Sequence, residues 1–351
     1  MAFDPEKFAR QNIRRLVSYS SARHEFAGDA EIYLDANENA FGSPVKTQLN
    51  RYPDPLQMAV KEKIAESKGV DPAQIFIGNG SDEAIDLLFR IFCEPGRDEV
   101  IICPPTYGMY KVAADINAVF IEQVSLTTAF QLDVPQILRA ITPATKMIFI
   151  CSPNNPTGNA IDREDILHIA GSFQGVVIVD EAYIDFSSGL SLIDEIGNFQ
   201  NLAVLQTFSK AWGLAGARVG MAFGDEQLIA LFNRVKAPYN VSQLAQDTIL
   251  AAWNNEAEVK SWIQRIVEQR QLLADALNGL EFVQTVYPSD ANFLLVKVVN
   301  AEAVYSFLLK EKIVVRDRSN VRLCEDCLRI TIGTPEENGR LLLSLKSFGK
   351  N

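Results

Sequence analysis

The chain carries a lysine in a segment where a surface charge is not expected. The stretch TFSKAWGLAGARVG, residues 207–220, is mostly small and apolar, yet it contains Lys210 and Arg218. A surface helix spreads its charges along one polar face, whereas Phe208 and Trp212 flank this lysine. We therefore expect Lys210 to lie out of water, where the pKa of an amine falls and the amine can act as a nucleophile or a base.

Other residues capable of chemistry follow strand-like segments along the chain. GNGSDE follows the strand-like IFIG, and its Gly80 lets the backbone approach a phosphate at the start of a helix. Tyr107 follows EVIIC, the turn PNNPTG follows MIFICS, and VVIVD ends at Asp180. Each alone reads as a turn, a helix cap or a core residue. Together they place an anion cradle, an aromatic ring, an amide and a carboxylate near Lys210, which indicates one active site.

Two nucleotide-binding interpretations fail on the sequence. GNGSDE begins like the dinucleotide fingerprint GxGxxG, but Glu83 stands where the third glycine belongs. VVIVDEAY resembles the acidic strand end of a P-loop ATPase, yet the chain contains no GxxxxGK[ST] motif.

The elements that must position these residues alternate between helix and strand. Helical patterns such as LQMAVKEKIAES and SDEAIDLLFRIF are separated by short apolar runs such as EVIIC, TKMIFICS, VVIVDEA and LAVLQTF. This alternation predicts an α/β fold with a largely parallel sheet, in which ligands bind beyond the carboxyl ends of the strands.

The pattern changes after about Trp253, where a long charged stretch predicts a connecting helix and then a small α+β unit. We expect three parts: an N-terminal arm (1–44) that packs with the small domain, a large cofactor-binding domain (45–254), and a small C-terminal domain (255–351).

Composition and charge argue against several classes of partner and site. The chain has 351 residues and a net charge of −11, which argues against nucleic acid and anionic membranes as partners. Its N-terminus lacks the apolar run of a signal peptide, and no segment is apolar enough to span a bilayer, so we expect a cytoplasmic protein. Five cysteines, with a lone CxxC at Cys324 and Cys327, indicate buried free thiols rather than a zinc or redox site. The two histidines are too few and too scattered for a histidine metal site, so we expect no metal.

The motifs SPNNPTG, VDEAY and SKAWGLAGARVG, in this order, resemble those of pyridoxal-phosphate aminotransferases with the aspartate-aminotransferase fold. Within that superfamily YSSAR, LDANENAFG, RYPDP, CPPTYGMY, IVVRDR and CLRITIGT are similar to histidinol-phosphate aminotransferases. The resemblance covers nearly the whole chain. It implies fold type I: a large domain with a mostly parallel sheet of about seven strands flanked by helices, and a smaller α+β domain.

The resemblance also implies a cofactor, pyridoxal 5′-phosphate, bound covalently to Lys210. Asp180 would pair with the ring nitrogen, and Lys210, Asp180 and Tyr183 would form the catalytic set. Tyr107 would stack on the ring, and Asn155 with Tyr183 would bind its hydroxyl. The cofactor phosphate would be held by the remaining matched positions: Gly80, Ser81, Asp82, Thr207, Ser209 and Arg218, with Tyr52 from a neighbouring subunit.

Substrate recognition follows from two further arginines. In the resembling family, the positions matching Arg316 and Arg329 grip the substrate phosphate, and a pair of arginines suits a dianion. An ion pair of Arg316 with Asp317 or Glu325 is the structural alternative. Tyr19, Asn37 and Asn154 are further candidates for the substrate pocket. The role of Tyr52 implies a homodimer with shared sites.

The activity implied is reversible transamination of histidinol phosphate with 2-oxoglutarate, giving imidazole-acetol phosphate and glutamate, in histidine biosynthesis. Two alternatives share the cofactor motifs: an aromatic amino-acid aminotransferase and a phosphothreonine decarboxylase. A third belongs to another class, a non-catalytic regulatory module that binds pyridoxal phosphate. Such regulators carry an added DNA-binding domain, and this acidic chain has no basic helix pair.

Overall fold

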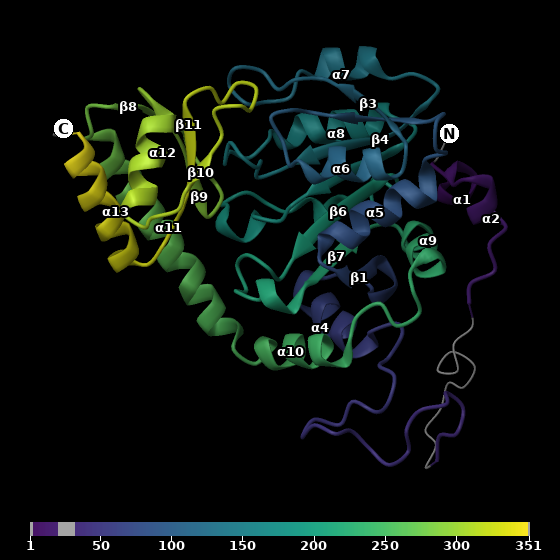
Figure 1. The fold of residues 1–351 in the computed structure, drawn as a ribbon. Coiled ribbons are helices and arrows are strands. Elements are labelled where there is room, and N and C mark those ends of the chain that lie inside the picture. Colours follow the sequence, from purple (N-terminus) through teal and green to yellow (C-terminus); the bar gives the residue numbers. More distant parts are fainter. Residues whose placement is uncertain (1–2, 20–31, 350–351) are drawn as a thin grey trace.

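A seven-stranded sheet forms the centre of the larger part of the computed structural model, which describes residues 3–19 and 32–349 (Figure 1). The strand order is β1-β7-β6-β5-β4-β2-β3, and only β7 runs antiparallel to its neighbours. The strands are β1 (Ile75–Asn79), β2 (Glu99–Ile102), β3 (Phe120–Gln123), β4 (Thr145–Cys151), β5 (Val176–Asp180), β6 (Leu202–Thr207) and β7 (Val219–Phe223). Because the central strands are buried on both faces, their runs of β-branched residues fit a covered sheet.

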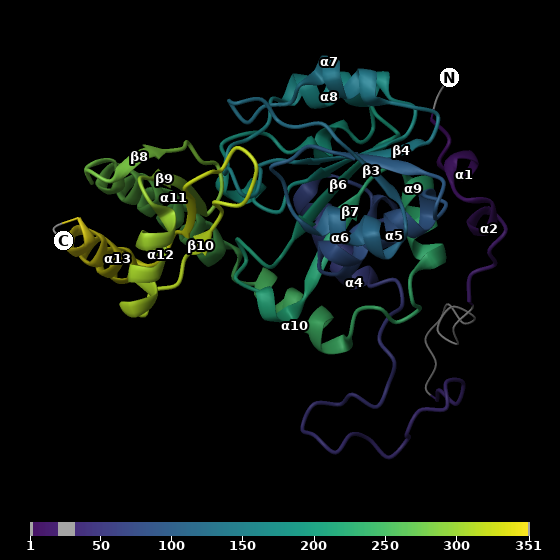
Figure 2. The same ribbon diagram turned by 45° about the horizontal axis from the view of Figure 1, so that its top comes forward.

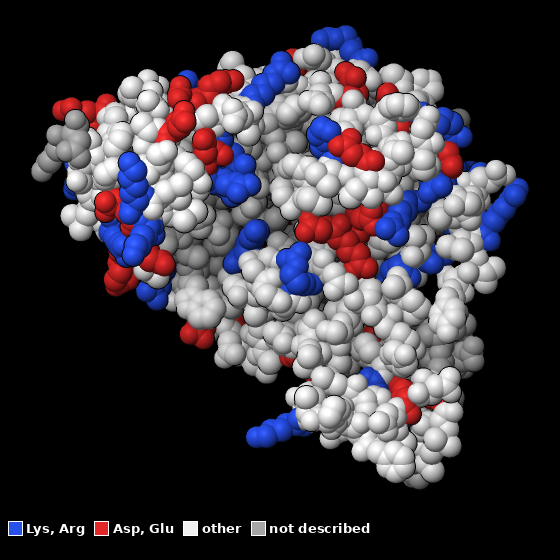
Figure 3. Space-filling model, viewed as in Figure 1, with Lys and Arg blue, Asp and Glu red and all other residues white. Residues whose placement is uncertain are grey.

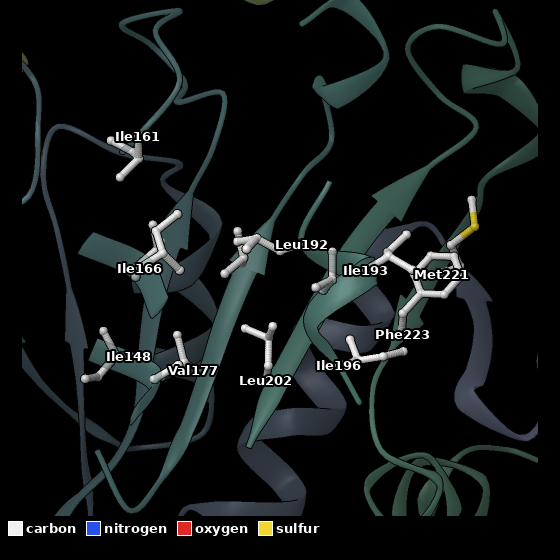
Figure 4. Close-up of a cluster of buried hydrophobic side chains, with 14 of the residues drawn as sticks. Ile148, Ile161, Ile166, Val177, Leu192, Ile193, Ile196, Leu202, Met221 and Phe223 are labelled. Atoms are coloured by element: carbon white, nitrogen blue, oxygen red, sulfur yellow. The ribbon is translucent and has the colours of Figure 1, made fainter. Parts of the chain in front are cut away.

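Helices cover both faces of this sheet (Figures 1 and 2). One face packs against α5 (Ser81–Phe92), α6 (Met109–Ile116) and α9 (Glu226–Val235). The other packs against α4 (Met58–Lys68), α7 (Val134–Ala140), α8 (Arg163–Ser172) and α10 (Gln243–Trp253). Figure 4 shows part of this second core, where Ile148, Val177 and Leu202 from three neighbouring strands lie beneath Ile166 and Leu192. Short 3₁₀ turns complete the domain: η1 (Pro72–Gln74), η2 (Ile184–Phe186), η3 (Leu192–Glu195) and η4 (Ala215–Ala217).

The smaller part follows the long helix α11 (Glu256–Asn278) and contains a four-stranded antiparallel sheet in the order β10-β11-β9-β8. Its elements are β8 (Val283–Val286), β9 (Phe293–Val298), α12 (Ala301–Lys310), β10 (Arg316–Asp317), β11 (Cys327–Thr331) and α13 (Pro335–Phe348). A separate apolar cluster fills the space between this sheet and the helices. The predicted largely parallel sheet and the small α+β unit are therefore confirmed, whereas β3, α7, α9 and α10 were not anticipated.

The first residues of the chain pack on the large domain, whereas the sequence led us to expect the arm beside the small domain. The short helices α1 (Pro5–Phe8) and α2 (Gln11–Arg14) lie against α5 and α9. Ala9, which follows α1, and Ile13 of α2 are buried there, and Glu6 of α1 pairs with Arg234 of α9. Apolar residues shared with the large-domain core thus decide where this segment lies. Residues 20–23 of YSSAR lie outside the described residues.

Residues 32–57 extend away from the body of the molecule (Figures 1 and 2). Large apolar side chains on this arm are exposed to solvent, namely Ile32, Leu34, Phe41, Val45, Leu49 and Tyr52. The arm is nevertheless held to itself, because the Glu38 carboxylate accepts hydrogen bonds from the Arg51 side chain and the Tyr52 backbone. Over the described residues, no helix is both long and apolar enough to cross a membrane.

Gly220 allows β7 to approach the start of α5, and we predict that Gly220→Ala destabilises the fold. A Cβ at this position would lie 2.2 Å from the backbone N of Ser81 and 2.4 Å from the carbonyl carbon of Gly80. Backbone atoms cannot relieve this clash by a rotamer change as a side chain could. We therefore expect a loss of about 1–3 kcal/mol in the free energy of unfolding.

Urea unfolding of the variant and of Gly216→Ala makes the comparison. Nothing lies within 4 Å of a Cβ at Gly216, so this control should be close to neutral. Equal stability of the two variants would contradict the steric explanation.

Candidate active site

A cavity of about 710 Å³ lies between the two domains, where the carboxyl ends of the large-sheet strands face the small sheet. Figure 3 shows basic side chains along the hollow between these two parts. The cavity brings together most residues that the sequence singled out: Gly80, Ser81, Asp82, Tyr107, Asn155, Asp180, Tyr183, Thr207, Ser209, Lys210, Arg218, Arg316 and Arg329. The prediction of one site at successive strand ends is therefore matched by the geometry.

The start of α5 forms an anion cradle at one end of the cavity. Gly80 adopts φ 73° before the helix, and a Cβ there would lie 2.7 Å from the Arg218 guanidinium. The backbone conformation and the close contact both favour glycine. Arg218 donates a hydrogen bond to Asp82 at 3.2 Å and remains half-exposed to the cavity. Free N–H groups at the helix start and this guanidinium together suit a phosphate.

A hydrogen-bond network behind the cradle fixes β1, the strand that leads into it. Asn240 donates from its side chain to the carbonyl of Ile77 at 2.9 Å and to the Glu83 carboxylate. Glu83 in turn accepts a hydrogen bond from the Asn79 side chain at 3.0 Å. Lys236 donates to Asn240 at 3.1 Å and to the carbonyl of Pro55 at 2.7 Å. The base of the extended arm is thus joined to the cradle by polar contacts.

Asp180 places a carboxylate at the floor of the cavity, and the residue is only 2% exposed. Its two oxygens accept hydrogen bonds from the Tyr110 hydroxyl at 2.8 Å and from the Ala182 backbone at 3.1 Å. Burial raises the pKa of the Asp180 carboxyl to about 6, although both hydrogen bonds favour the charged form. No described cation forms an ion pair with it, so the carboxylate is available to a cationic ligand.

Lys210 is more open than the sequence suggested. Its neighbours Phe208 and Ala211 are buried, but Lys210 itself is exposed because its side chain projects into the cavity. The expectation of a lysine wholly out of water is therefore wrong. The cavity walls still enclose the amino group in part, and this burial, together with the nearby Arg329 guanidinium, lowers the pKa of Lys210.

Aromatic and hydroxyl groups line the rest of the large-domain side. The Tyr107 hydroxyl donates to Asp82 at 3.1 Å. The Lys210 amino group lies 5.6 Å from the centre of the Tyr183 ring. Thr207 donates to Ser209 at 2.9 Å, so the two hydroxyls form a small polar patch next to Lys210.

The small-domain side contributes arginines without carboxylate partners. Arg316 and Arg329 lie opposite each other on β10 and β11, and Arg329 donates a hydrogen bond to Asn155 across the cavity. Within residues 3–19 and 32–349, neither arginine forms an ion pair, so the alternative pairing of Arg316 with Asp317 or Glu325 is absent.

Four predicted site residues do not line this cavity in the single chain. Asn154 is buried, and its side chain donates to the carbonyl of Pro105 at 2.8 Å and to Thr157 at 2.7 Å, which gives it a structural role in the turn. Tyr19 is exposed on the N-terminal segment. Asn37 and Tyr52 line a separate hollow of about 460 Å³ on the arm.

Two residues of the site, Tyr110 and Arg318, are not among those predicted from the sequence. Tyr110 lies three residues after Tyr107, and helical spacing could have placed both on one face. Arg318 lies two residues after Arg316, which is the spacing of side chains on one face of a strand. All five cysteines are buried and free, as predicted.

The buried Asp180 carboxylate generates a stability prediction for the ligand-free protein. Its folded-state pKa lies above the value of 3.8 for an unperturbed aspartate. The unfolded state therefore ionises first, and the resulting destabilisation grows as pH rises from about 4 and is complete above about 6. We expect Asp180→Asn to raise the free energy of unfolding at pH 7.5 by about 1–3 kcal/mol.

Urea unfolding at pH 7.5 and at pH 4.5 measures this effect. The gain should shrink at pH 4.5, where the folded wild-type carboxyl is mostly protonated. An Asp180→Asn protein that is less stable at pH 7.5, or equally stabilised at both pH values, would contradict the prediction.

Comparison with known proteins agrees with this geometry. Residues 34–345 match the family described as aminotransferase class I and II. The chain is 52% identical to a histidinol-phosphate aminotransferase from Parabacteroides distasonis, over 98% of this chain and 99% of the relative. It is 47% identical to a histidinol-phosphate aminotransferase from Cytophaga hutchinsonii, over 99% of this chain and 100% of the relative.

A solved structure gives the same result for the fold. The crystal structure of the histidinol-phosphate aminotransferase from Clostridium acetobutylicum matches with a TM-score of 0.80 at 25% identity, covering 86% of this chain and 92% of that one. The chain therefore belongs to the class I and II aminotransferases, and within them to the histidinol-phosphate aminotransferases.

Proposed function

We propose that this protein catalyses reversible transamination between histidinol phosphate and 2-oxoglutarate, giving imidazole-acetol phosphate and glutamate in histidine biosynthesis. Family membership over almost the full chain supports the reaction type. The choice of substrate is supported by one observation, the group of unpaired arginines opposite Lys210. These cations suit a phosphorylated substrate.

The residues of the cavity fit pyridoxal 5′-phosphate, the cofactor of this family. The cradle at Gly80 and Ser81, together with Arg218, suits its phosphate. The buried Asp180 carboxylate, which lacks a cationic partner, suits the protonated ring nitrogen. Lys210 supplies an amino group for covalent attachment between these two points.

When bound, the cofactor would supply an electron sink for the substrate carbon that loses its proton, and it would carry the amino group from one substrate to the other. Lys210 would move a proton to and from the substrate carbon that bears the amine, which requires a neutral amine and hence a lowered pKa. Asp180 would hold the proton of the ring nitrogen, and the Tyr110 hydroxyl, which donates to that carboxylate, favours its charged form and orients it. Tyr107 would stack on the ring face, and Asn155 and Tyr183 would bind the ring hydroxyl; all three line the cavity.

Arg316 and Arg329 bind the anionic end of the substrate. Histidinol phosphate has a phosphate and no carboxylate, whereas glutamate presents carboxylates to the same Arg329. Two guanidiniums on opposed strands offer several N–H donors to one dianion. An aromatic amino acid would leave much of this charge unmatched.

We infer that the protein acts as a homodimer in which the arm of one subunit completes the site of the other. Residues 32–57 extend from the body with exposed apolar side chains, among them Phe41 and Leu34. Tyr52 lies on this arm, stacked on Tyr239 with ring centres 4.4 Å apart. A second copy of the chain would cover these apolar residues and receive Tyr52 at its cofactor phosphate.

The substrate prediction is tested in single half-reactions. The protein loaded with pyridoxal phosphate is mixed separately with histidinol phosphate, phosphothreonine and phenylalanine, and the visible absorption of the cofactor is followed. We expect histidinol phosphate to react at least about tenfold faster than phenylalanine, because a site with unpaired charged donors discriminates against ligands that leave them unpaired. Phosphothreonine also carries a phosphate, so its reaction is identified by its product.

Equal reaction with phenylalanine would indicate a broader aromatic aminotransferase, and release of carbon dioxide from phosphothreonine would indicate the decarboxylase. Lys210→Ala should lose both the covalently bound cofactor and all turnover, whereas Lys63→Ala, an exposed lysine in α4, should behave as wild type.

Shared sites generate a complementation prediction. Lys210→Ala and Tyr52→Ala should each have little activity, but a dimer formed from one of each contains one site with both native residues. Random exchange of subunits should therefore restore up to about a quarter of wild-type activity. The measurement is turnover after the two variants are unfolded together and refolded. No recovery in dimers shown to have exchanged would refute the sharing of Tyr52 between subunits.

A further inference from the structure

A third arginine, Arg318, faces the cavity beside Arg316 and Arg329. Arg316 lies opposite Arg329 in the antiparallel pair of β10 and β11, and the Arg318 backbone N–H donates to the carbonyl of Cys327 at 2.9 Å. The pairing therefore continues one residue beyond β10. Because side chains alternate along a strand, Arg316 and Arg318 share the face that carries Arg329.

Arg318 has a buried donor that the protein does not satisfy. Its Nε is buried without a hydrogen-bond partner, although the side chain as a whole is only half-buried. The nearby acids are engaged elsewhere, because Asp317 accepts from the Ser319 backbone at 2.8 Å and Glu325 accepts from the Leu323 backbone at 3.1 Å. Over the described residues, no ion pair involves Arg318. A buried N–H without a partner costs free energy, so an anion that accepts from it would be favoured.

The three guanidiniums also repel one another. Burial, followed by the charges of Arg329 and Arg316, lowers the pKa of Arg318. Like charges gathered in a cavity without carboxylate partners are stabilised by a ligand of more than one negative charge. A phosphate monoester dianion has this charge and three oxygens that accept hydrogen bonds.

The position of Arg318 allows it to contact the phosphate of histidinol phosphate but not the α-carboxylate of glutamate. Arg329 is the arginine on the Lys210 side of the group, since it donates to Asn155 and its charge lowers the pKa of Lys210. In glutamate the α-carboxylate carbon is bonded directly to the reacting carbon, and with this group at Arg329 the γ-carboxylate lies on the substituent that takes the place of the imidazole arm. In histidinol phosphate a methylene group and an ester oxygen separate the reacting carbon from phosphorus. The phosphate therefore extends further toward the small domain than the α-carboxylate does.

We propose that Arg318 is a specificity-determining residue that binds the substrate phosphate and takes no part in binding glutamate. This inference rests on the proposed function, because it assigns a residue to the phosphorylated substrate of that reaction. It makes the phosphate subsite a cluster of three arginines rather than the pair that the sequence motifs indicated.

The test compares Arg318→Gln and Arg318→Lys with a matched control, Arg322→Gln. Arg322 is exposed in the same loop and does not line the cavity. For each protein, kcat/KM is measured in the half-reactions with histidinol phosphate, with unphosphorylated histidinol and with glutamate. Wild-type turnover of histidinol phosphate is established first, so failure of the proposed function is recognised before any variant is compared.

We expect Arg318→Gln to lower kcat/KM for histidinol phosphate by about 10–100-fold, the usual effect of losing charged hydrogen bonds. Its values for histidinol and glutamate should stay within about twofold of wild type, as should all three for Arg322→Gln. Arg318→Lys should recover part of the loss, because it restores the charge without the planar fork.

Two results would overturn the proposal. An equal loss with glutamate or histidinol would show that Arg318 only supports the shape of the site. An unchanged kcat/KM for histidinol phosphate in Arg318→Gln would show that Arg316 and Arg329 hold the phosphate without it.

Discussion

The site depends on a carboxylate that the fold takes out of water. Asp180 ends β5, the central strand of the sheet, and is 2% exposed. Burial disfavours its charge, and the Tyr110 hydroxyl and the Ala182 backbone offset this in part. A cationic ring nitrogen above Asp180 would offset the remainder. In the ligand-free protein the buried carboxylate charge therefore has an unfavourable free energy, which binding of a cationic partner would relieve.

The sheet determines how the other groups reach this carboxylate. Parallel strands β4, β5 and β6 end at one edge, so the turn with Asn155, the carboxylate of Asp180 and the hydroxyl of Thr207 lie side by side. The antiparallel β7 then returns beside β1 and brings Arg218 to the cradle at Gly80. The close contact at Gly220 makes this approach possible. One antiparallel strand in a parallel sheet thus places Arg218 beside the start of α5.

The sequence predicts those parts of the fold and the site that local patterns encode. Apolar strands followed by Asp180, Asn155 and Lys210 were recognisable because each strand end has a short local motif. The packing of residues 4–14 was not, since Ala9 and Ile13 find partners in α5 and α9, which are distant in sequence. The burial of Asn154 depends likewise on the carbonyl of Pro105 from another loop. Long-range contacts of this kind leave no periodic signal in the chain.

Cations from both domains line the cavity, although the chain as a whole is acidic. The whole chain has a net charge of −11, yet the described cavity is lined by Lys210, Arg218, Arg316, Arg318 and Arg329 against the carboxylates Asp82 and Asp180. Arg218 lies on the large domain and three of the arginines lie on the small one, so two separated anionic groups can be bound at opposite ends. An acidic surface weakens indiscriminate attraction of anions, while the cations that line the cavity act at short range on a ligand inside it. Under the proposed function, selectivity for small phosphorylated ligands would follow from the placement of these cations rather than from the total charge.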